Sequence, residues 1–159
     1  MQFAKNISTK VIFLSDGVIT ESGTAEQIFE NPQNEKTRKF VFGISELPIE
    51  ITSGNFDFYS SMTEITKFCE RNYLPHRVID NICSVFEELA VIHLMPKMSD
   101  NDRIKINIKC IEKTEQVSMT INYTMPFDAE CEINDISMSI IKHRVKSTDY
   151  QHGSITFMI

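Results

Sequence analysis

VIFLSDGVITESGTAEQIFENPQNEKTRKF, residues 11–40, predicts a β-hairpin followed by two short helices. Residues 10–14 and 18–21 are rich in strand-forming side chains. The Asp16-Gly17 pair between them is a strong signal for a two-residue hairpin turn, because both residue types tolerate positive φ. The sequence therefore predicts a tight hairpin at the start of this stretch.

The helices are expected directly after the hairpin. Thr24 and Gln27 fit a capping box for a helix over 25–30, and a second short helix is expected over 34–41. Residues 1–43 as a whole are too few to bury a sizeable core. We therefore expect this first unit to be unstable alone unless it packs on another body.

Residues 49–159 predict a second unit, joined to the first by a linker at 44–48. Their element order, β, α, α, β, β, α, β, β, predicts an α+β fold: a two-layer sandwich with helices on one face of a mainly antiparallel, mixed sheet. The expected strands are 49–51 with 56–58, 104–110, 117–123 and a closing hairpin over 148–159; the expected helices are 60–72, capped by Ser60 or Ser61, then 75–94 and 136–145.

The helix over 75–94 has the clearest period in the chain. Its apolar residues recur at the i, i+3, i+4, i+7 spacing, which predicts one buried face. The last position of that face is open between Ile92 and His93. The pattern comprises Val78, Ile82, Val85, Phe86, Leu89 and one of those two residues.

Composition and charge indicate a soluble protein. Hydrophobic residues make up 42% and charged residues 24%, and no apolar run approaches the ~20 residues that span a bilayer. We expect a cytoplasmic location, with attachment at the inner membrane only through a transporter complex. Residues 1–43 carry five basic and five acidic side chains, so the rest of the chain carries the whole net charge of −6. That acidity argues against nucleic acid and anionic lipid as partners.

Cysteines and histidines predict no metal site. The four cysteines are at least 14 positions apart, so no CxxC pair exists, and the four histidines form no close ligand pair. We expect buried free thiols and surface or capping histidines. The residues are Cys69, Cys83, Cys110 and Cys131, with His76, His93, His143 and His152.

Residues 11–40 resemble the C-terminal end of the ATP-binding subunit of polar amino-acid ABC transporters, over about 1–42. The likeness is carried by the strand, the Asp-Gly turn, a second strand ending in Glu-x-Gly, Asn-Pro-Gln and a basic helix. That family's switch histidine precedes a Met-x-Phe-Ala segment, and this chain begins Met-Gln-Phe-Ala. No P-loop string occurs. We expect a piece of a longer protein, with none of the family's nucleotide-site residues.

Three segments resemble the GHKL (histidine-kinase-like) ATPase fold, especially its anti-sigma serine kinases: NICSVFEELAVIHL (81–94), INYTMPFDAE (121–130) and DYQHGSITFMI (149–159). The resemblance implies a magnesium-holding Asn where this chain has Ile92, which cannot coordinate a hard cation. It implies an adenine-binding Asp-Gly at Tyr123 and Thr124; Asn122, one place earlier, is a poor substitute. The implied glycine-rich phosphate lid falls on 134–139, which contain no glycine.

A remnant cleft is the candidate site that this resemblance implies. Glu88 matches the family's general base, although a solvent-exposed helix carboxylate beside Glu87 is the favoured explanation. Pro126-Phe127 is expected to be a packed turn. The candidate cleft residues are Glu88, Ile92, Asn122, Phe127 and Asp128.

These observations predict a regulatory or interaction portion of an amino-acid ABC importer ATPase subunit, without a catalytic nucleotide site or enzymatic activity of its own. Its expected partners are a protein, a second copy, a small ligand or an upstream ABC ATPase domain, and no cofactor or metal is expected. The alternative is a divergent ATP-binding anti-sigma-type serine kinase, which would use ATP and magnesium. A third possibility is a structural remnant without activity.

Overall fold

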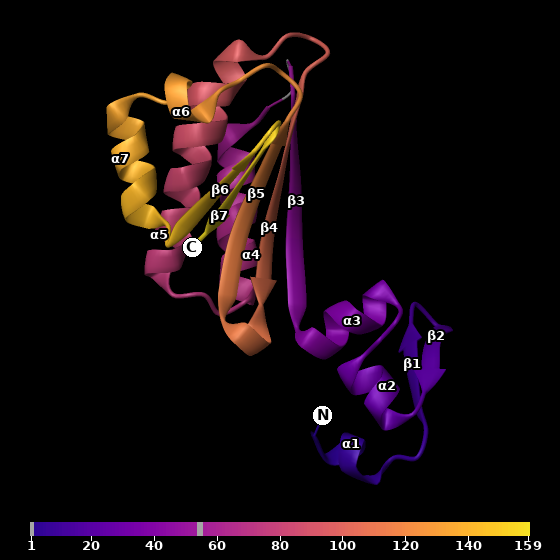
Figure 1. Cartoon of the computed structure of the whole chain (residues 1–159). Helices are drawn as coiled ribbons and strands as arrows, with labels where there is room; N and C mark the ends of the chain where they lie inside the picture. The colour runs from indigo at the N-terminus through magenta and orange to yellow at the C-terminus, as the bar shows by residue number, and fades with distance from the viewer. Residues whose placement is uncertain (1, 54–55) are drawn as a thin grey trace. The chain divides into compact units, whose positions relative to one another are not determined.

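The computed structural model describes residues 2–53 and 56–159 and consists of two compact units (Figure 1). The first unit runs up to Ser45 and takes in Ile111–Glu115, and the second comprises Glu46–Cys110 and Gln116–Ile159. Each unit is described by itself below.

A two-residue hairpin organises the first unit. Strands β1 (Val11–Ser15) and β2 (Val18–Gly23) pair antiparallel, with Ser15 opposite Val18. Asp16 and Gly17 have φ of 54° and 79°, the positive values that a type I′ turn requires. The predicted hairpin and its turn are therefore confirmed.

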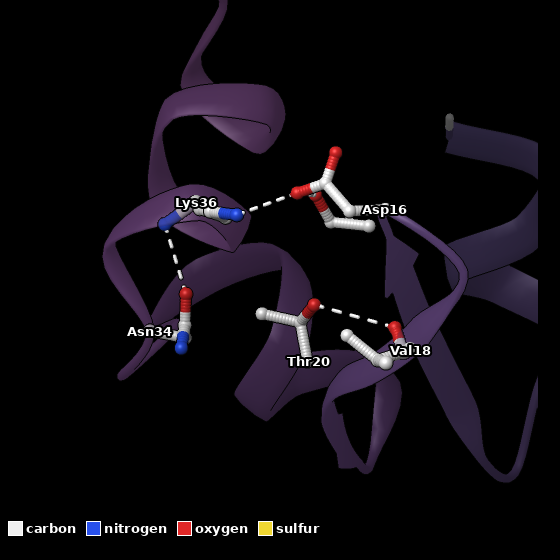
Figure 2. A network of polar contacts seen from close by, with 6 residues as sticks. Asp16, Val18, Thr20, Asn34 and Lys36 are labelled. Atoms are coloured by element: carbon white, nitrogen blue, oxygen red, sulfur yellow. Dashed lines mark hydrogen bonds and ion pairs between the residues drawn. The ribbon is translucent and has the colours of Figure 1, made fainter.

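Side-chain caps fix the two helices after the hairpin, α2 (Ala25–Glu30) and α3 (Glu35–Phe42). Thr24 and Gln27 form the predicted capping box at the start of α2. At the start of α3, Asn34 Oδ1 accepts the backbone N–H of Lys36 at 2.9 Å, and the Lys36 ammonium pairs with Asp16 at 2.6 Å (Figure 2). The hairpin turn is thus tied to α3. A further helix, α1 (Gln2–Ile7), was not predicted.

One face of the hairpin remains uncovered. Phe13 packs on Phe40 of α3, with ring centroids 5.2 Å apart. Ile12 and Leu14 alternate with Phe13 and so share the opposite face, and Ile19 lies directly across from Leu14. Ile12, Leu14 and Ile19 are 49%, 63% and 64% exposed. We call these three residues the apolar hairpin face.

The second unit is an α+β sandwich, as predicted. Its five-stranded sheet has the order β3-β4-β5-β7-β6, and β7 pairs antiparallel with both β5 and β6. Helices α4, α5 and α7 lie on one face of the sheet (Figure 1). The strands are β3 (Ile44–Thr52), β4 (Arg103–Ile111), β5 (Gln116–Tyr123), β6 (Ser147–Gln151) and β7 (Ser154–Met158).

The helical layer contains one unusual element. Helix α5 (His76–Val85) continues into a nine-residue π-helical segment, η1 (Phe86–Leu94), where the sequence predicts one continuous α-helix. Its buried residues still follow the predicted face, and the open position is taken by His93, while Ile92 is 46% exposed. The remaining elements are α4 (Phe58–Arg71), the 3-10 turns η2 (Met95–Lys97) and η3 (Glu112–Thr114), α6 (Ala129–Glu132) and α7 (Asp135–Arg144).

The core lies between the helices and the inward face of the sheet. Alternate residues of β4 and β5 are buried, which confirms the period-2 pattern of these strands. Phe86 is fully buried in this core and packs against Phe56 and Phe58, with ring centroids 6.2 and 6.4 Å away. The inward strand residues are Ile104, Ile106, Ile108, Cys110, Val117, Met119, Ile121 and Tyr123.

Two sequence interpretations differ from the structure. Residues 44–48, expected to be a linker, form the first half of β3. Pro48 is tolerated there because β3 is an edge strand, where a missing N–H need not break the ladder. Helix α4 begins at Phe58, where a strand was expected. Asp57 caps it by accepting the N–H of Ser60 at 3.0 Å, so the predicted Ser60 or Ser61 cap is wrong.

Candidate functional site

The structure brings together two of the five candidate cleft residues. Phe127 and Asp128, between β5 and α6, line one groove. Glu88 and Ile92 lie on the π-helical segment and do not line it. Asn122 alternates with inward-facing neighbours on β5, so it points to the opposite, helix-free face of the sheet. The five residues therefore do not form one cleft.

The groove lies beside the carboxyl end of β5 and the β6–β7 turn. Its volume is ≈ 630 Å³, within the usual range for a small-molecule site. Helix α6, the end of β6 and the turn after it all contribute lining residues. The lining residues are Tyr123, Pro126, Phe127, Asp128, Ala129, Glu132, Tyr150, Gln151 and His152.

Tyr123 and Phe127 build the aromatic part of the groove. Their rings meet edge-to-face at a centroid distance of 5.6 Å, and the Tyr123 hydroxyl donates to the Phe127 carbonyl at 3.3 Å. Burial, followed by the nearby Asp128 charge, raises the pKa of Tyr123 above its ordinary value. The phenol therefore stays protonated at neutral pH and keeps its proton directed at the Phe127 carbonyl.

Lys97 and Glu132 close one side of this arrangement. The Lys97 ammonium forms an ion pair with Glu132 and lies 4.9 Å from the centroid of the Phe127 ring. Glu132 also accepts the backbone N–H of Asp128 at 2.7 Å. The positive charge nearest the groove is thus already engaged by a carboxylate and an aromatic ring.

His93 forms a second polar contact, below the start of α7. Only 8% of this residue is exposed, and its Nε2 lies 3.4 Å from Asn134 Nδ2. Asn134 caps α7, since its Oδ1 accepts the N–H of Ser137 at 2.9 Å. Burial lowers the pKa of His93; Lys97 lowers it further, while Glu88 opposes the shift. The prediction of surface or capping histidines is therefore wrong for His93.

Cysteine and metal chemistry find little basis in the described residues. No group of three or more His, Cys, Asp or Glu side chains in that part of the chain could hold a metal ion. Cys69 and Cys110 are buried as predicted, and burial raises the pKa of Cys69 to about 12, which makes its thiol unreactive. Cys131, in contrast, is exposed. Within residues 2–53 and 56–159, no helix is both long and apolar enough to span a bilayer.

Part of the chain is similar to ATP-binding proteins of amino-acid ABC transporters. It is 45% identical over 51 residues to the probable amino-acid import ATP-binding protein YxeO of Bacillus subtilis strain 168, covering 32% of this chain and 20% of that protein. It is 49% identical over 43 residues to the histidine transport ATP-binding protein HisP of Pseudomonas aeruginosa, covering 27% and 17%. It is 42% identical over 41 residues to the arginine transport ATP-binding protein ArgV of Corynebacterium glutamicum, covering 26% of this chain and 16% of that protein.

These similarities cover only a fraction of either partner in each comparison. The chain spans about a fifth or less of the length of these relatives. No protein-family model matches the chain. The resemblance of residues 49–159 to GHKL ATPases finds no support in these comparisons and stays a prediction.

Proposed function

We propose that this chain is the C-terminal regulatory or interaction portion of an amino-acid ABC importer ATPase subunit, with no catalytic nucleotide site of its own. The observation that carries the proposal is the high identity of a short segment to importer ATP-binding proteins of about five times its length. The first unit would attach the chain to an ATP-binding body in the cytoplasm. The second unit would be the regulatory part, with a degenerate GHKL-like fold.

The apolar hairpin face supports the attachment role. Ile12, Leu14 and Ile19 are each about half or more exposed, although they form one continuous cross-strand surface. Exposed apolar clusters of this kind commonly mark surfaces that another body covers. The first unit buries only a few apolar side chains, chiefly Ile28 and Val41, so an added partner would supply most of its stabilisation.

The charge of the groove supports the absence of nucleotide chemistry. None of its described lining residues is a lysine or arginine, and Lys97 beside it is paired with Glu132. Triphosphate binding needs cations or a cradle of backbone N–H groups. Ile92 cannot hold magnesium, and Glu88 and Asn122 lie outside the groove.

We expect calorimetric titration of the full chain with ATP and Mg²⁺ to give no saturable heat. Binding in the micromolar range would overturn the proposal and favour the alternative, an ATP-binding anti-sigma-type serine kinase. The groove favours that alternative only by its size and by Phe127 and Asp128, two residues of the predicted cleft. A titration with Mg²⁺ alone serves as the control for metal binding without nucleotide.

A chimera tests the attachment role: the C-terminal segment of the Bacillus relative is replaced by residues 1–45 of this chain. We expect this chimera to hydrolyse ATP as the Bacillus relative does. Adding Leu14→Lys to that chimera should lower its melting temperature and its ATPase rate, because the lysine would be buried against the ATP-binding body. Thermal melts and phosphate release measure the two effects. A matched Glu26→Lys chimera changes an exposed residue of α2 and should behave like the parent chimera. Equal behaviour of both variants would contradict the attachment role of the hairpin face.

A further inference from the structure

We propose that the groove at the carboxyl end of β5 binds a small organic cation, an ammonium or guanidinium group carried on an apolar stem. This ligand site goes beyond the proposed attachment to an importer and does not depend on it. The inference comes from the volume, charge and aromatic lining of the groove, which together select one class of ligand.

The charge of the groove favours a cation. Asp128 and Glu132 line it, and no described lining residue is a lysine or arginine. The two carboxylates of the lining together outweigh the single positive charge of Lys97 beside the groove. The effect of Asp128 is visible at Tyr123, where its charge adds to burial in raising the pKa of the phenol. An anion entering this groove would meet the same repulsion, whereas a cation would be attracted.

The aromatic lining favours a cation on an organic stem over a bare metal ion. Tyr123, Phe127 and Tyr150 line the groove together with Pro126 and Ala129. Aromatic faces attract ammonium and guanidinium groups, and apolar walls hold the aliphatic stem. The Lys97 ammonium already uses the Phe127 ring in this way, at 4.9 Å from the ring centroid. The groove thus contains an internal example of the contact that a ligand would make.

Polar residues from the end of β6 and the following turn can orient such a ligand. Gln151 and His152 line the groove from there, and Asp128 lines it from the segment just before α6. The volume of ≈ 630 Å³ accommodates an amino acid or an amine with bridging water. We therefore expect Asp128 to pair with the cation, with Tyr150, Pro126 and Ala129 holding its stem.

Calorimetry of the full chain with L-arginine tests the proposal. L-citrulline, which replaces the guanidinium by a neutral urea group of similar shape, is the matched ligand control. We expect saturable binding of arginine, at least about tenfold weaker binding of citrulline, and weaker arginine binding at high salt. Absence of saturation below about 10 mM arginine, or equal binding of the two ligands, would overturn the proposal.

Two variants locate the site. Asp128→Asn should weaken arginine binding about tenfold, whereas Asp80→Asn, which removes the same charge from an exposed position on α5, should leave it unchanged. Tyr150→Ala should weaken arginine binding at least about threefold. This variant is the test of location if Asp128→Asn loses its cooperative melt and therefore does not fold. Arginine binding that survives both groove variants at full strength would refute this location. Loss of arginine binding has no bearing on the ATP titration or the chimera, so the proposed function fails or survives separately.

Discussion

Replacing Phe86 by alanine is expected to destabilise the second unit more than any other single change considered for this chain. Phe86 is fully buried at the junction of α5 and the π-helical segment, where it contacts the rings of Phe56 and Phe58. Truncating a buried phenylalanine removes its transfer free energy and leaves a cavity, at a cost of about 3–5 kcal/mol. Since domains of this size have only about 5–15 kcal/mol of stability, the melting temperature should fall by more than about 10 °C.

The geometry around Phe86 explains why the cavity should not close. Its two ring neighbours come from the segment before α4 and from α4 itself. The Phe58 ring lies nearly parallel to Phe86, at an interplanar angle of 19°, and the Phe56 ring is tilted at 45°. Filling the space would require both rings to leave this packing, so we expect only partial collapse of the cavity.

Tyr59→Ala provides the matched control for Phe86→Ala. Tyr59 is on the same helix as Phe58, contacts its ring edge-on at 5.5 Å and is 81% exposed. Its loss should cost no more than about 1 kcal/mol. Phe86→Leu retains most of the side-chain volume, so its loss of stability should lie between those of Phe86→Ala and Tyr59→Ala. Circular-dichroism melts of the three variants rank them, and a Phe86→Ala protein as stable as Tyr59→Ala would show that Phe86 does not hold the core together.

The sequence predicts elements whose signals are local. The Asp16-Gly17 turn follows from two residues that tolerate positive φ, and the α2 cap from the spacing of Thr24 and Gln27. Strands β4 and β5 follow from alternation over eight or nine residues. In each case the deciding interaction lies within a few positions along the chain, so the pattern contains the information.

Prediction from the sequence fails where contacts between residues far apart in the chain determine the structure. Residues 44–48 are predicted to be a linker, yet pairing at the sheet edge makes them part of β3, where Pro48 is tolerated. Hydrophobicity favours Ile92 over His93 for the buried position. The structure buries His93 instead, because it continues the i, i+3, i+4 face that includes Phe86 and Leu89 and because Asn134 offers its ring a polar contact.

The candidate site shows the same division. Phe127 and Asp128 are only one position apart and follow the end of β5, so a motif could place them together in the groove. The other lining residues Glu132, Tyr150 and His152 belong to α6, β6 and the β6–β7 turn, which no local pattern connects to β5. Asn122 is a candidate cleft residue because it is next to Tyr123 in the sequence. A shift of one residue along a strand, however, places a side chain on the other face of the sheet.

His93 should make the stability of the second unit depend on pH near neutrality. Burial lowers the pKa of its imidazole in the folded state, whereas the unfolded chain titrates near pH 6.5. At pH values below about 6.5, the unfolded chain therefore binds a proton that the folded protein excludes. The stability contributed by neutral His93 is complete above this pH and is lost as the pH falls through it toward the folded pKa. One proton changes the free energy of unfolding by at most about 1.4 kcal/mol per pH unit.

The contact with Asn134 gives this pH dependence a structural consequence. Asn134 uses its Oδ1 to cap α7 through the Ser137 N–H, so its amide nitrogen faces His93 Nε2. The imidazole must then accept at Nε2 and carry its proton on Nδ1. Protonation would place two donors against each other, and rotating the Asn134 amide to relieve this would break the cap of α7. The first turn of α7 should therefore loosen before the rest of the unit as the pH falls.

Urea unfolding between about pH 7.5 and 5.5, above the range where ordinary carboxylates titrate, measures this effect. Wild-type protein should lose stability across this range, and His93→Gln, which stays neutral, should lose less. His76→Gln, at an exposed position that begins α5, should retain the wild-type slope. Hydrogen exchange at Ser137 and Met138 should quicken on acidification in wild type, because these amides bond to Asn134. Identical slopes for wild type and His93→Gln would mean that the folded and unfolded states bind the His93 proton equally, and would contradict control of this proton by burial.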